Sequence, residues 1–148
     1  MIPTLAILSL GIGCGGSKQE VTAAELDQKA DQICATEQTK FKQIQAHPPA
    51  NASDAADQTK ELIGVAETAN SALDDLEPPD ALRDPLDVYL GARSDAIDLM
   101  KKGQDAAENQ DSRGYEEAQT AVAKSAAKRK KLADSLGFKV CSSSAKSV

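Results

Sequence analysis

The chain has 148 residues, a net charge of −6 and an aromatic content of 3% without tryptophan. A chain of this length forms one domain, and its core must come from leucine, isoleucine, valine and many alanines, which favours closely packed helices. The negative net charge argues against nucleic acid as a partner, because phosphate binding depends on clustered lysine and arginine. The charge is uneven, however. Residues 54–87 hold ten acidic and two basic side chains, whereas residues 112–148 hold eight basic and three acidic ones.

The chain opens with an apolar run that leads into three glycines, Gly11, Gly13 and Gly16. Their Gly-x-Gly-x-x-Gly spacing matches a dinucleotide-binding loop, but such a loop needs a strand before it and an acidic residue at the end of a second strand, and the following residues predict helices. The twelve residues 2–13 are too few for a membrane-spanning helix, which needs about 20 apolar residues. Their length suits the apolar region of a secretory signal.

Cys14 follows the residues LGIG and precedes small residues. This arrangement resembles the lipobox of bacterial lipoproteins, in which a diacylglycerol is attached to the cysteine and the leader is cut just before it. The resemblance implies a signal peptide at 1–13, a lipidated Cys14 and a flexible tether at 14–21. The chain departs from the family pattern in having Gly11 where a leucine is usual, and no basic residue precedes the apolar run, so we expect the true start to lie further upstream. The alternative is a plain secretory signal in which Cys14 is incidental.

With Cys14 lipidated, Cys34 and Cys141 remain as a pair. In an exported protein an even number of cysteines indicates a disulfide, and this one would join the first helix to the segment after the last helix. The alternative is two unrelated buried thiols. Neither cysteine belongs to a Cys-x-x-Cys motif, so redox catalysis has no support.

Four stretches have apolar residues recurring three or four positions apart, which predicts amphipathic helices. Thr22 and Glu25 have the spacing of a capping box at the start of the first helix. Pairs of prolines end the first two helices, and Gly137 followed by Phe138 predicts the C-cap of the last. The predicted helices span about 22–46, 54–76, 80–108 and 112–136.

Four such helices with short connections form an all-α, antiparallel up-down-up-down four-helix bundle, which we assign to residues 22–141. The signal and tether precede it, and a disordered tail is expected at 142–148. The first and last helices then run antiparallel, and Cys34 lies about 18 Å along the first. The segment 137–141 must therefore run back alongside the first helix for a disulfide to form.

The sequence has few residues that could carry chemistry. The single histidine, His47, stands in a His-Pro-Pro connection, and the inward positions hold no cluster of carboxylates for a metal site. No nucleophile has a suitable base beside it. We therefore predict that the protein is not an enzyme, with no catalytic residues, no metal and no cofactor.

Glu37 and Arg93 each fall in the middle of an apolar stripe, at similar heights on parallel helices. One hypothesis is a buried ion pair that lines an interhelical polar pocket. The other is that both lie at the edge of the stripe and extend their charged ends into solvent. We favour the second.

Lys124, Lys128 and Lys131 recur at spacings of four and three in the last helix, and Arg129, which also falls in the stripe of that helix, and Lys130 add to this group. This basic patch predicts binding to an anionic membrane surface or cell-wall polymer. Alternatively the patch faces the acidic second helix of the same bundle and balances its charge. The net negative charge slightly favours this second interpretation.

Taken together, four features resemble small lipoproteins of high-GC Gram-positive bacteria. They are the lipobox at Cys14, the pair of Cys34 and Cys141, the helix break Pro78-Pro79-x-x-Leu82 and the cap at Leu136-Gly137. The resemblance implies an exported, disulfide-closed helical bundle and no activity.

We expect a module anchored by lipid at the extracytoplasmic face of the cell membrane, with a non-enzymatic interaction or structural role in the envelope. An envelope protein or a cell-wall polymer would be its partner. The alternative is a small-ligand binding protein with a polar pocket near Glu37 and Arg93.

Overall fold

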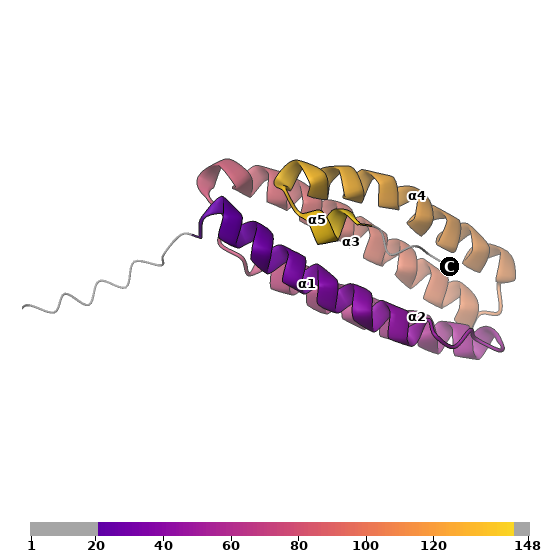
Figure 1. Ribbon diagram of the computed structural model, residues 1–148. Coiled ribbons are helices and arrows are strands. Elements are labelled where there is room, and N and C mark those ends of the chain that lie inside the picture. The colour runs from indigo at the N-terminus through magenta and orange to yellow at the C-terminus, as the bar shows by residue number, and fades with distance from the viewer. Residues whose placement is uncertain (1–20, 144–148) are drawn as a thin grey trace, which may run out of the picture.

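The computed structural model describes residues 21–143. Within them the chain forms four long helices and one short one, which Figure 1 shows in chain order. They are α1 (Ala23–Ile44), α2 (Ala52–Asp74), α3 (Asp80–Glu108), α4 (Ser112–Leu136) and α5 (Lys139–Ser142). The predicted signal peptide, Cys14, most of the tether and the last five residues lie outside the described part of the chain.

The four long helices pack in sequence order, α1 on α2, α2 on α3 and α3 on α4. Consecutive helices run in opposite directions, so the fold is the predicted all-α, up-down four-helix bundle (Figure 1). α5 packs against both α4 and α1 and connects the last long helix to the first. None of the helices in residues 21–143 combines the length and the apolar character that a membrane span requires.

Side chains cap α1 and α2 at their N-termini and determine where these helices begin. At α1 the Glu25 amide donates to Thr22 Oγ1 at 3.3 Å and the Thr22 amide donates to Glu25 Oε2 at 2.8 Å, which completes the predicted capping box. The Thr22 amide and the Thr22 hydroxyl both donate to the exposed Glu25 carboxylate and lower its pKa. At α2 the Asp54 amide donates to Asn51 Oδ1 at 2.9 Å, so this helix begins two residues earlier than predicted.

The ends of α1 and α2 also differ slightly from the prediction. Each helix ends two residues before its predicted end, whereas α3 and α4 have the predicted bounds. The residue before a proline avoids helical geometry, and the turn that leads to each proline pair lies outside the helix. The chain around Gln45 forms such a turn, with its amide donating to the Phe41 carbonyl at 2.9 Å.

Gly137 ends α4 as the sequence predicts. Its φ is +91°, in the left-handed region that favours glycine. The Phe138 amide donates to the Ala133 carbonyl at 3.0 Å and the Gly137 amide to the Asp134 carbonyl at 3.1 Å, the two bonds of a Schellman motif. This turn directs Phe138 into the core, where it is fully buried.

After this turn the chain runs back along α1, as the predicted disulfide requires. Cys34 and Cys141 form that disulfide, with their Cα atoms 5.2 Å apart. The Asp31 carboxylate accepts the backbone amides of Lys139 at 3.1 Å and Val140 at 2.8 Å, and it therefore caps the start of α5. Ser142, predicted to begin the tail, is buried instead and is the last residue of α5.

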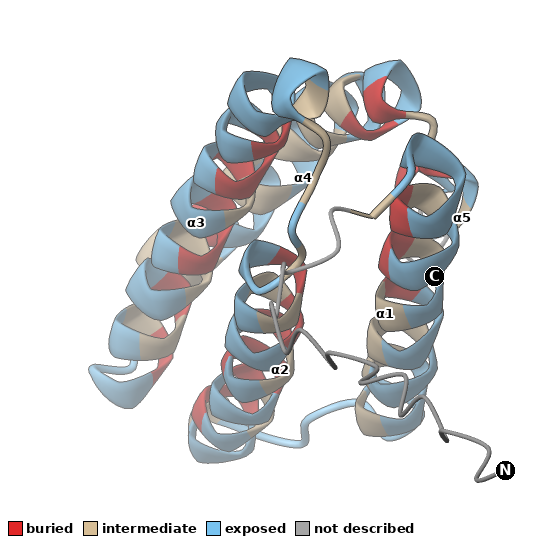
Figure 2. Ribbon diagram, turned by 90° about the vertical axis from the view of Figure 1, so that its left-hand side faces the viewer, coloured by how far each residue is buried: buried red, intermediate tan, exposed pale blue. Residues whose placement is uncertain are grey.

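The core is divided along the bundle axis. Buried residues form stripes on the inward sides of the helices (Figure 2). The largest cluster lies where α1 begins and α4 ends, and includes Leu26, Leu73, Leu90, Leu136 and Phe138. A smaller cluster of Ile63, Ala66 and Ile97, with Phe41 and Met100 packed against it, lies further along the bundle. A third joins Ala55, Ala56 and Ala107, with Tyr115 packed against them.

Candidate functional site

Glu37 of α1 and Arg93 of α3 form an ion pair inside the bundle. Arg93 Nη2 lies 2.7 Å from Glu37 Oε1, and the two side chains are only 10% and 12% exposed. The interpretation that we favoured from sequence, with both charged ends in solvent, is therefore wrong. The two residues face each other because parallel helices place them at the same height.

Arg93 uses its other donors on neutral groups. Its Nε donates to Asn70 Oδ1 of α2 at 3.2 Å, and its Nη1 donates to the Tyr89 hydroxyl at 3.3 Å. The guanidinium also lies over the Tyr89 ring, 5.7 Å from its centroid. Tyr89 in turn makes an edge-to-face contact with Phe138, with ring centroids 5.9 Å apart. Arg93 is therefore held by α1, α2 and its own helix.

Arg129 of α4 is a second, partly buried guanidinium in the same region. It donates to Ser125 Oγ one helical turn away, and Ser125 donates to the Val122 carbonyl at 2.7 Å. Burial and the nearby charge of Arg93 lower the pKa of Arg129, and Tyr89 and Glu37 offset this in part. Arg129 therefore lies close enough to the ion pair to interact with both of its members.

Each long helix thus contributes one residue to a polar layer, which consists of Glu37, Asn70, Arg93 and Arg129. The layer separates two apolar clusters. On α1, Glu37 lies between Cys34 of the largest cluster and Phe41 of the next. On α3, Arg93 lies in the same way between Leu90 and Ile97.

The electrostatics of the polar layer depend on its one carboxylate. Burial alone would lower the pKa of Arg93, but the charge of Glu37, together with Tyr89 and the hydrogen bonds to both, raises it above its ordinary value. Among the described residues, Arg129 has no carboxylate partner. Its one hydrogen bond there goes to the neutral Ser125 hydroxyl. With two guanidiniums and one carboxylate, the layer carries a net charge of about +1.

Sequence reasoning identified Glu37 and Arg93 but did not bring the rest of the layer together. Arg129 and Ser125 were placed in the stripe of the fourth helix, but Arg129 was also counted with the basic patch and was not connected with Glu37 and Arg93. Asn70 is adjacent to the inward Ala69 and carries no charge that would draw attention. The available signal was the interruption of three of the four stripes at one height, by Glu37, Arg93 and Arg129.

The interhelical polar pocket near Glu37 and Arg93 stays a prediction. Two surface pockets, of about 600 and 490 Å³, lie between α2 and α3, and neither is lined by Glu37 or Arg93. The first is at the connection between the helices and includes Glu77 and Arg83. The second includes Asn70 and Ser94, so it reaches the outer edge of the polar layer.

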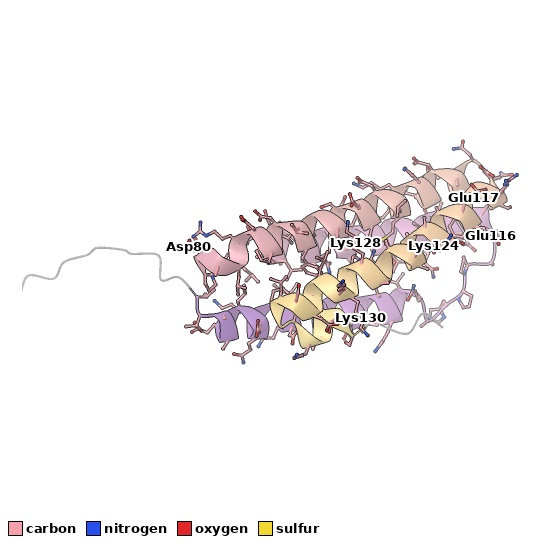
Figure 3. The ribbon with its side chains drawn as sticks, turned by 90° about the horizontal axis from the view of Figure 1, so that it is seen from above. Asp80, Glu116, Glu117, Lys124, Lys128 and Lys130 are labelled. Carbon is pink, nitrogen blue, oxygen red and sulfur yellow. A yellow bond between two sulfur atoms is a disulfide. The ribbon has the colours of Figure 1, made fainter. Side chains whose placement is uncertain are left out.

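The basic patch of Lys124, Lys128 and Lys131 lies on exposed positions of α4. Figure 3 shows Lys124 and Lys128, with the neighbouring Lys130, spaced along α4, while Glu116 and Glu117 lie near its beginning. In the described chain none of the three patch lysines forms an ion pair. α4 packs chiefly against α3 and α5 rather than α2, so packing does not place this patch against the acidic second helix.

The remaining residues singled out in the sequence are His47 and the three cysteines. His47 is exposed in the connection between α1 and α2. Over residues 21–143 we find no group of three or more histidine, cysteine or acidic side chains that could hold a metal ion. Cys34 and Cys141 are brought together as a disulfide, and Cys14 lies outside the described residues.

Fold and site define a small all-helical protein, an up-down bundle whose first helix is linked by a disulfide to the segment after its last long helix. No protein-family model matches the chain, and neither the curated proteins nor the solved structures searched contain a match.

Proposed function

We propose that the protein is a lipid-anchored, non-enzymatic interaction module at the extracytoplasmic face of the cell membrane. Two features support this location. Disulfides persist in oxidising compartments outside the cytosol, and Cys34 pairs with Cys141. The residues around Cys14 resemble a lipobox, which supplies the anchor.

The location is tested by the intact mass of the protein purified from membranes of a bacterial host. We expect a chain that begins at Cys14 and carries a diacylglycerol, with two further cysteines that react with an alkylating reagent only after reduction. A Cys14→Ser variant is the matched control and should lose the lipid while keeping the disulfide. An unprocessed chain with three free thiols would contradict both the anchor and the compartment.

The interaction role is carried by one observation, the unpaired basic patch on α4. Residues 118–133 contain five basic and no acidic side chains, in a protein with a net charge of −6. The patch lies in the half of α4 that ends beside the start of α1, where Ala133 and Leu136 pack with Leu26. Anionic headgroups attract such clusters of lysine by about 1 kcal/mol per residue close to the surface.

The anchor would bring this patch within reach of the bilayer. The eight residues between Cys14 and α1 span at most about 27 Å when fully extended. An anionic membrane surface is therefore the partner that we assign to the patch. A cell-wall polymer is the competing partner.

Binding is tested with the chain from residue 15 onwards and vesicles of anionic or zwitterionic phospholipid. Replacing the three patch lysines by glutamine removes about 3 kcal/mol of attraction, which is more than a hundredfold in the partition coefficient. The matched control makes the same change at three exposed lysines elsewhere, Lys40, Lys42 and Lys60.

We expect binding to anionic vesicles that weakens with salt, is lost with the patch variant and is kept by the control. Equal binding to both kinds of vesicle, or equal loss in both variants, would refute the membrane assignment. Binding to a purified anionic wall polymer in the absence of vesicle binding would transfer the patch to that partner.

A further inference from the structure

The polar layer has more positive than negative charge in a partly dehydrated position. Arg93 is satisfied by a carboxylate, an amide and a phenol, with Glu37 at 2.7 Å. Arg129 has the Ser125 hydroxyl of its own helix and no carboxylate among the described residues. Because a guanidinium carries five N–H donors, most of the hydrogen-bonding capacity of Arg129 remains open.

α5 bridges α1 and α4 only as far as the height of the polar layer. α5 packs against both α1 and α4, whereas α1 and α4 do not form a main helix–helix contact of their own. The Gln38 side chain donates to the carbonyls of Val140 and Ser143, each at 2.9 Å, so α5 ends close to the height of Glu37. Beyond this height, α1 and α4 are no longer bridged by α5.

Beyond the end of α5, both α1 and α4 carry partly buried apolar residues within two turns of the polar layer. Phe41 is one turn past Glu37 on α1, and Val122 is two turns before Arg129 on α4. Because α1 and α4 run antiparallel, both lie on the same side of the polar layer along the bundle axis. A group that reaches Arg129 from this side would have a charged end at the layer and an apolar environment beside it.

From this geometry we propose that Arg129 binds the carboxylate of a small organic acid, with Arg93 contributing its charge from behind the Glu37 ion pair. One carboxylate brings the layer to two positive and two negative charges. A guanidinium matches a carboxylate with two parallel hydrogen bonds, and Ser125 holds the Arg129 side chain in place for this contact.

This inference is independent of the membrane proposal, because Arg129 is partly buried and interacts with Glu37 and Arg93, whereas the three patch lysines are exposed. Lys128 supplies the matched control. It precedes Arg129 on α4, carries the same charge and is exposed. Arg129→Gln and Lys128→Gln change the net charge equally, and only the first alters the polar layer.

The test is a titration of the full chain, labelled with nitrogen-15, with sodium acetate replacing sodium chloride at constant ionic strength. We expect the arginine side-chain resonance that disappears in Arg129→Gln to shift in a saturable way in the wild type and in Lys128→Gln. The dissociation constant should differ by less than twofold between these two proteins. Arg129→Gln should weaken binding at least tenfold.

Arg129→Lys provides a second variant that keeps the charge without the planar fork, and we expect it to weaken acetate binding by several-fold. Acetate should also raise the melting temperature of the wild type and not that of Arg129→Gln. Non-saturable shifts, or equal effects in Arg129→Gln and Lys128→Gln, would overturn the site. A parallel titration with inorganic phosphate that binds more tightly than acetate would overturn the assignment to carboxylates.

Discussion

Glu37 is the residue on which the polar layer depends, so its replacement by glutamine should destabilise the protein strongly. The substitution leaves Arg93 and Arg129 without a carboxylate in a position where Glu37 and Arg93 are only 12% and 10% exposed. Removing one partner of a buried ion pair costs about 3 to 5 kcal/mol. Glutamine keeps the shape and one acceptor for Arg93, which places the expected loss near the lower end, at about 3 kcal/mol.

The matched control is Glu117→Gln. Glu117 pairs with Arg113 at 2.9 Å on the surface of α4, where the two side chains are 67% and 89% exposed. An exposed pair of this kind contributes about 0.5 kcal/mol or less. The same chemical change at nearly the same distance therefore isolates the effect of burial.

The assay is equilibrium unfolding in urea, followed by circular dichroism at neutral pH. A single domain of this size has a total stability of about 5 to 15 kcal/mol, so a loss of 3 is well resolved. In the Glu37→Gln background, Arg129→Gln should recover part of the loss, because it removes one of two unbalanced charges. A loss below about 1 kcal/mol for Glu37→Gln, or a value equal to that of Glu117→Gln, would refute the role assigned to the layer.

Two further predictions concern the covalent and conformational closure of the bundle. Replacing both Cys34 and Cys141 by alanine should lower the free energy of unfolding by up to about 4.7 kcal/mol, because a loop of more than 100 residues is released. The urea m-value should rise, because the unfolded chain becomes less compact. A loss below about 1 kcal/mol in urea unfolding would contradict this prediction. Gly137→Ala should destabilise by at least about 1 kcal/mol, because φ is +91° and the new Cβ would lie 2.8 Å from Asp27 Oδ2. Gln110→Gly should have the opposite sign, about 0.5 to 1 kcal/mol of stabilisation, because Gln110 has a φ of +57°; thermal unfolding of both variants checks the two signs.

The sequence predicted the helices well because their ends carry local chemistry. The capping box at Thr22, the proline pairs and Gly137 act within a few residues, and the structure has each of them in the expected role. The direction of the last segment was also predictable, since a disulfide between Cys34 and Cys141 requires it to run back along α1.

The helix α5 could not be predicted in the same way. It has four residues, too few for a periodic pattern, and it depends on contacts with a distant part of the chain. Asp31 accepts its first amides from a position 108 residues away in sequence, and Gln38 donates to its carbonyl end. Such a short helix forms because tertiary partners satisfy its backbone groups.

The polar layer shows the limit of periodicity more clearly. A repeat of three and four residues identifies which face of a helix turns inward, and it placed Glu37, Arg93 and Arg129 on such faces. It does not give the depth of a side chain or its partners on other helices. The depth and the partners of a side chain depend on how far each helix is shifted along the bundle axis relative to its neighbours. Contacts between residues distant in sequence determine that shift.

The layer and the disulfide together determine how α1 is aligned with the rest of the bundle. Much of the core is alanine, whose small side chains specify the relative height of two helices only weakly. A shift of α1 by one turn would move Glu37 by about 5.4 Å. That shift would break its 2.7 Å contact with Arg93 and place Ile33 or Phe41 beside two guanidiniums. The disulfide at Cys34 opposes the same movement one turn away, so a charged contact and a covalent bond fix α1 at adjacent heights.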